Sequence, residues 1–62
     1  MFDKARANDK DYMLNVVSHN GYALGYASDE LQNDKDVVLA AVRESGGALE
    51  YASDEMKNNK YV

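Results

Sequence analysis

The sequence predicts an all-α protein, a small bundle or stack of about four short helices. One observation is that a 25-residue unit occurs twice in tandem, at 9–33 and 34–58, with the same amino acid at 14 of the 25 positions. Another is that apolar residues within each unit recur at helical spacing, with no proline and little β-branched alternation. Each unit is therefore expected to be a helix-hairpin repeat with two helical segments.

The first helical segment of each unit is expected to begin at an aspartate, Asp9 or Asp34, and to run for about ten residues. Aspartate is a good N-cap, and a second acid two residues later is favoured by the helix dipole. Apolar residues then form one stripe of the helix, at Met13, Leu14 and Val17 and at Val38, Leu39 and Val42. Gly21 and Gly46 are predicted to end these helices as left-handed C-caps.

The second segment of each unit starts just after the glycine and leaves two interpretations open. Leu24, Ala27 and Leu31, like Leu49, Ala52 and Met56, share one face if the helix is continuous. Alternatively the helix breaks at Ser28 and Ser53, because serine followed by two acids is itself an N-cap signal. We expect a short helix, followed by a turn or a 3₁₀ piece through Leu31 or Met56.

The chain is expected to be a single domain, 1–62, in which repeat one and repeat two lie between a partial unit at 1–8 and a stub at 59–62. A domain of this size buries only about 60% of the surface of its unfolded chain. It has no cysteine for a disulfide, so stability must come from helix packing or self-association. Met1 and Phe2, with Tyr61 and Val62, are predicted at the unfinished ends of the stack.

The residues also resemble a known family. The runs Asp34 to Val42 and Gly47 to Met56 closely match the short tandem helical repeat catalogued as domain of unknown function 4116, and the likeness covers about fifty residues. In that family proline often follows the serine, which implies that Ser28 and Ser53 begin a new turn here. The resemblance implies a helical fold and no established activity.

Composition excludes several classes of function. The formal net charge is -4, and the seven basic residues are dispersed, so neither nucleic acid nor an anionic membrane is an expected partner. No stretch approaches the roughly 20 apolar residues that span a membrane, and no signal-peptide run begins the chain. A cytoplasmic protein is the expectation.

Two repeated motifs suggest chemistry, but helix capping explains both. Asp34 and Asp36, like Asp9 and Asp11, could share a divalent cation, yet a calcium loop needs glycine at the sixth position, where Leu39 stands. Ser28 and Ser53 precede acids, but a nucleophilic serine needs a positioned base, and the chain has a single histidine. We therefore expect no enzyme, no metal site and no cofactor.

The candidate interaction residues are those that differ between the two units or lie at the ends of the chain. Tyr26 and Tyr51 are equivalent and are expected to pack in the core or between units, whereas Tyr12 and Tyr22 are surface candidates because valine and glycine replace them in repeat two. His19 lies near a helix C-terminus, where its charged form is favoured. The predicted surface comprises Tyr12, His19, Tyr22, Met1, Phe2 and Tyr61.

The predicted function is a non-enzymatic helical-repeat module that binds an unknown protein partner or self-associates. The alternative is a small acidic inhibitor, or nucleic-acid mimic, that occupies a basic groove of its target. Salt dependence distinguishes them, because a charge mimic binds more weakly as salt rises.

Overall fold

The computed structural model describes residues 3–59, and in this range the secondary structure is entirely helical. A short 3₁₀ helix, η1 (Lys4–Arg6), comes first. The elements that follow are α1 (Lys10–His19), η2 (Gly21–Tyr26), α2 (Asp29–Gln32), α3 (Lys35–Glu44), η3 (Gly46–Tyr51) and α4 (Asp54–Lys57). The all-α prediction is confirmed.

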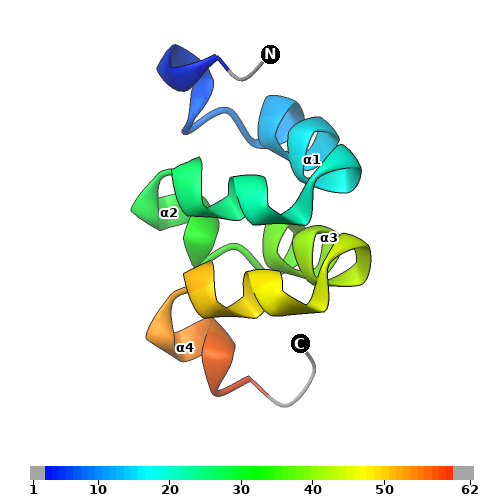
Figure 1. The fold of residues 1–62 in the computed structure, drawn as a ribbon. Coiled ribbons are helices and arrows are strands. Elements are labelled where there is room, and N and C mark those ends of the chain that lie inside the picture. The colour runs from blue at the N-terminus through cyan, green and yellow to red at the C-terminus, as the bar shows by residue number, and fades with distance from the viewer. Residues whose placement is uncertain (1–2, 60–62) are drawn as a thin grey trace.

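The same three elements occur in the same order in the first segment, residues 9–33, and in the second segment, residues 34–58. The two segments are stacked, with α1 over α3, η2 over η3 and α2 over α4 (Figure 1). The result is an elongated body of 30 × 20 × 16 Å with η1 near one end and α4 toward the other. The stack therefore has one internal interface and two end faces.

Side chains cap the helices at the predicted positions. Asp9 Oδ1 accepts from the Tyr12 amide at 3.1 Å, and Asp34 Oδ1 accepts from the amides of Asp36 and Val37 at 2.9 and 3.3 Å. Ser28 and Ser53 accept from the amides three residues later, at 3.3 and 3.2 Å. The interpretation with a break at the serines is therefore correct, and α2 and α4 are separate one-turn helices.

The helix types after the glycines are the reverse of the prediction. The piece after Gly21 or Gly46 is a 3₁₀ helix, and the piece through Leu31 or Met56 is α-helical. Each 3₁₀ helix joins two extended residues, such as Asn20 and Ala27. Six residues span about 12 Å as a 3₁₀ helix but only about 9 Å as an α-helix. The greater length of the 3₁₀ helix lets the chain cross the stack from the end of one α-helix to the start of the next.

The glycines do not act as left-handed C-caps, so that prediction was wrong. No residue in the range 3–59 has a positive φ, and α1 and α3 end instead at the extended residues Asn20 and Ser45. Gly21 is required for a steric reason, because a Cβ atom there would lie 2.3 Å from the Ala41 carbonyl oxygen. At Gly46 a Cβ atom would meet nothing within 4 Å.

The core runs along the stack between the α- and 3₁₀ helices. Its largest fully buried side chains are Met13, Val17, Leu24, Val37 and Val38. Leu14, Leu39 and Val42 of the predicted stripe are only partly buried. Burial of the core side chains supplies the main stabilising contribution, since each fully buried aliphatic side chain contributes about 1.5–3 kcal/mol.

The two glycines should respond differently to substitution. Gly21→Ala should lower the free energy of unfolding by about 1–3 kcal/mol, because the added methyl group overpacks against a backbone carbonyl. Gly46→Ala should change it by less than about 1 kcal/mol, because that position is open. Urea denaturation followed by circular dichroism measures both. Equal losses in the two variants would contradict the steric role of Gly21.

Candidate interaction surface

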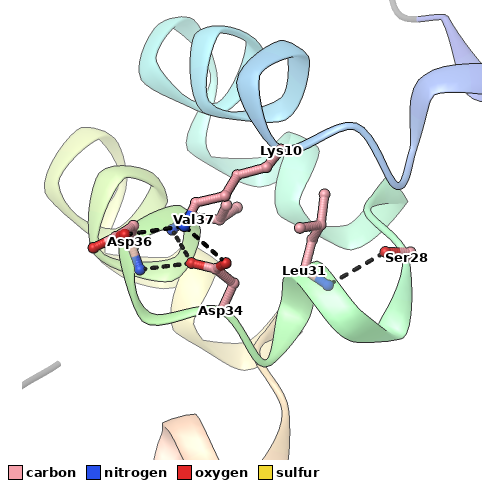
Figure 2. A network of polar contacts seen from close by, with 6 residues as sticks. All are labelled: Lys10, Ser28, Leu31, Asp34, Asp36 and Val37. Carbon is pink, nitrogen blue, oxygen red and sulfur yellow. Dashed lines mark hydrogen bonds and ion pairs between the residues drawn. The ribbon is translucent and has the colours of Figure 1, made fainter.

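The internal interface has an ion pair on one side of the stack. Lys10 Nζ on α1 lies 3.1 Å from Asp34 Oδ2 and 3.1 Å from Asp36 Oδ2 at the start of α3 (Figure 2). The carboxylates of Asp36 and Asp34 raise the pKa of Lys10. Partial burial opposes ionisation of Asp34, but hydrogen bonds from Lys10, Val37 and Asp36 outweigh it and lower the pKa of Asp34. One aspartate thus caps α3 and also holds the two segments together.

The corner between α1 and η2 lies against the C-terminal end of α3. The Gly21 amide donates to Glu44 Oε1 at 2.7 Å, and the Ser45 hydroxyl donates to the same oxygen at 2.6 Å. These two hydrogen bonds, the Ser45 bond first, lower the pKa of Glu44. Beside this contact the Tyr22 and Tyr51 rings meet edge-on, with centroids 6.3 Å apart and planes at 86°. The corner is therefore held by a backbone donor and by one aromatic contact.

The third contact of the interface is made by Ser53. Its amide donates to the Gln32 carbonyl at 2.9 Å, and its hydroxyl donates to Asn33 Oδ1 at 2.6 Å. Ser28 makes the same two bonds, at the same distances, to the Ala7 carbonyl and to Asn8 Oδ1. Relative to Ser28, residues 7–8 therefore occupy the place that residues 32–33 occupy relative to Ser53.

An open groove lies between α1 and η2 in the first segment, with a volume of about 470 Å³. Its lining comprises Tyr12, Asn15, Val16, His19, Asn20, Ala23 and Tyr26. We call it the end groove. Each lining residue stands 25 positions before a residue of the second segment, namely Val37, Ala40, Ala41, Glu44, Ser45, Ala48 and Tyr51.

In the second segment the equivalent surface is covered by the first. Ala41, Glu44 and Ser45 lie against Gly21, and Tyr51 lies against Tyr22 and Gly25. Val37 and Ala41 are fully buried there, whereas their counterparts Tyr12 and Val16 remain partly exposed. The end groove is thus an open version of the surface that receives the α1–η2 corner inside the molecule.

Two of the predicted surface residues, Tyr12 and His19, line the end groove together. Tyr22 is 51% exposed and lines an adjoining groove of about 340 Å³, which shares Asn20 and Tyr26 with the first. The structure therefore brings these three predicted residues to neighbouring grooves. Met1, Phe2 and Tyr61 lie outside the described residues.

Tyr12 and His19 have defined hydrogen-bond environments. The Asp3 amide donates to the Tyr12 hydroxyl, and the Arg6 guanidinium lies 5.5 Å from the Tyr12 ring centroid, so residues 3–6 cover part of this ring. His19 Nδ1 lies 2.8 Å from the Asn15 carbonyl oxygen. Because a carbonyl only accepts, Nδ1 carries a proton, and Nε2 of the neutral ring is an acceptor.

Tyr26 and Tyr51 were predicted to pack in the core or between the units, and Tyr26 does not lie in the core, because its side chain is 67% exposed. Tyr51 is 38% exposed and does pack between the segments, through its contact with Tyr22. The Tyr51 face of the second segment lies against the first segment, whereas the equivalent face of the first segment carries the end groove. The sequence also gave no signal for Asn15, Val16, Asn20 or Ala23 as groove residues, since their equivalents are ordinary core and cap positions.

The motifs considered for catalysis and metal binding have structural roles here. Asp9, Asp34, Ser28 and Ser53 cap helices, and Asp36 pairs with Lys10. Among residues 3–59 no three His, Cys, Asp or Glu side chains form a group that could hold a metal ion. Within the same range no helix is long and apolar enough to cross a membrane.

Comparison with known proteins identifies one family. The profile of the family described as Domain of unknown function (DUF4116) matches residues 9–60, which include both segments. The chain belongs to the DUF4116 family. No curated protein and no solved structure matches the chain significantly. In this DUF4116 protein the end groove is an open surface whose counterpart inside the molecule is occupied by protein.

The lowered pKa values of Asp34 and Glu44 predict stability that declines in acid. Both groups are held in the ionised form in the folded chain, so their contribution is complete above the ordinary values of 3.8 and 4.5 and is lost as pH falls through the lowered ones. Glu44→Gln removes one titrating group and should make the decline in melting temperature below about pH 4 shallower.

The measurement is thermal unfolding by circular dichroism between neutral and acid pH. Glu55→Gln is the matched control, since it removes an exposed carboxylate outside the internal interface. A decline that is equally steep in Glu44→Gln and in wild type would show that the Gly21–Glu44 contact does not contribute.

Proposed function

We propose that this DUF4116 protein is a non-enzymatic interaction module that binds a protein partner in the end groove. One observation carries the proposal. Each of the seven lining residues stands 25 positions before a residue of the second segment, and that surface of the second segment receives the α1–η2 corner inside the molecule. A surface of this shape and chemistry already has a protein occupant within the same chain. The groove is therefore suited to a protein segment.

The lining indicates what such a segment should present. Val16 and Ala23 supply apolar surface, Asn15, His19 and Asn20 supply polar groups, and Tyr12 and Tyr26 supply aromatic rings. Inside the molecule the occupant is a glycine whose amide donates to a side chain of the receiving surface, followed directly by an aromatic ring. A partner turn with a small residue, an available backbone donor and a nearby ring would satisfy the same groups. Tyrosine-rich, partly apolar surfaces of this kind are typical of protein interfaces.

A different observation favours the acidic-mimic alternative. α2 and α4 each begin with two exposed acids, Asp29 and Glu30 or Asp54 and Glu55. Both helices lie on the same side of the stack (Figure 1). This acidic side could bind a basic groove of a target protein. A cytoplasmic location remains a prediction under either proposal.

Site-specific photo-crosslinking in the native host tests the proposal. A benzophenone amino acid at position 26, in the end groove, should crosslink a defined set of proteins, whereas the same amino acid at position 55, on the acidic side, should not. Asn15→Trp, which fills the groove at an exposed helical position, should remove the crosslinks from position 26 and leave the melting temperature unchanged.

Salt separates the two candidates further. Crosslinking at position 26 should persist at about 0.5 M salt, where exposed charges are screened within a few ångströms. Crosslinks that form mainly at position 55 and disappear with salt would favour the acidic mimic. Equal labelling at both positions, unaffected by Asn15→Trp, would contradict binding in the groove.

A further inference from the structure

We propose that the end groove receives the α3–η3 corner of a second copy of this chain, so that molecules associate head to tail. The inference rests on the proposed function, because it takes the end groove as a docking site. Inside the molecule the α1–η2 corner lies on the second segment, and the α3–η3 corner is its counterpart 25 residues later. The chain thus presents both halves of one interface, one at each end of the stack.

The exposure of the corner supports this pairing. Gly46 is exposed and Leu49 is partly exposed, whereas their counterparts Gly21 and Leu24 are buried by the second segment. A Cβ atom at Gly46 would have open space, although one at Gly21 would collide with the Ala41 carbonyl. At the Gly46 end the stack therefore has the small residue and the apolar side chain that the internal interface uses, and among residues 3–59 both retain exposed surface.

The polar contacts of the internal interface have counterparts in the pair of molecules. The Gly46 amide takes the place of the Gly21 amide and meets His19 Nε2 in place of Glu44 Oε1. On the other side of the stack Lys35 holds the position of Lys10, opposite Asp9 and Asp11 of the second copy. Two substitutions weaken the contact, because Gly47 replaces Tyr22 and Glu50 replaces Gly25. The association is therefore weaker than the internal interface.

Residues 3–8 compete with the incoming copy. Ala7 and Asn8 accept hydrogen bonds from Ser28. In the docked pair Lys57 and Asn58 of the incoming copy would occupy the same position and make the same bonds. Full docking replaces these bonds with equivalent ones from the incoming copy. The N-terminal segment thereby limits assembly and releases the site when it detaches.

Sedimentation equilibrium of the full chain over a range of concentrations tests the inference. The average mass of the wild type should rise with concentration beyond that of a dimer, because a head-to-tail interface leaves one groove and one corner free. Gly46→Leu should remain monomeric with an unchanged melting temperature, because the new side chain meets nothing in its own molecule. Glu55→Leu, at an exposed position of α4 outside the interface, is the matched control and should associate as the wild type does.

Two further variants should strengthen association. His19→Glu gives the end groove the carboxylate acceptor that Glu44 supplies in the internal interface. It should tighten association by about tenfold, the usual gain of a charged over a neutral acceptor. Asn8→Ala weakens the hold of residues 3–8 on Ser28 and should also raise the average mass, while Asn58→Ala should lower it. Adding Gly46→Leu to His19→Glu should abolish the gain.

The inference is overturned if wild type and Gly46→Leu have the same average mass at every concentration up to about 1 mM, the range in which even weak pairs form. It is likewise overturned if His19→Glu leaves association unchanged. Should either result occur while position 26 still crosslinks other proteins, the proposed function stands and only the second copy is excluded. Loss of both signals would remove the groove as a docking site.

Discussion

The close approach of Gly21 to the C-terminal end of α3 is the contact on which the rest of the structure depends. Backbone meets backbone there, with the Gly21 amide bonded to Glu44 and no room for a Cβ atom beside the Ala41 carbonyl. Because the α1–η2 corner lies so close to α3, η2 can cross the second segment, and Ala48 and Leu24 are buried. A larger side chain at position 21 would move η2 away from the second segment and expose part of the core. A chain of 62 residues has a small core, so this loss of burial would be a large share of its stability.

Short-range capping then fixes where each element begins. Asp34 begins the second segment and caps α3, and its second carboxylate oxygen pairs with Lys10 of the first segment. Ser53 starts α4 and at the same time binds the Gln32 carbonyl and Asn33. The same side chains thus set the local helix boundary and the register between segments. This double use explains why the acids and serines recur at fixed positions without a metal or a nucleophile being needed.

Features that depend on neighbouring residues could be predicted from the sequence, whereas those that depend on the distance between elements could not. The N-caps at Asp9, Asp34, Ser28 and Ser53 involve atoms two or three residues apart, and the apolar stripe follows helical periodicity. The 3₁₀ form of η2 depends on how far the chain must cross the stack, and periodicity carries no such information. The function of Gly21 was mistaken because conformational freedom and close packing both favour glycine, and only the position of Ala41 distinguishes them.

The candidate site shows the same division. Tyr12, His19 and Tyr22 could be singled out because they differ from their equivalents, but Tyr26 could not, since Tyr51 has the same identity and a different environment. The difference arises from stacking alone: a surface covered in one segment is open in the other. Any stack of equivalent segments leaves two such end faces, and substitutions concentrated on one of them change what can dock there without altering the internal interface. His19 in place of Glu44 is such a substitution, because it exchanges a charged carboxylate acceptor for the Nε2 atom of a neutral imidazole.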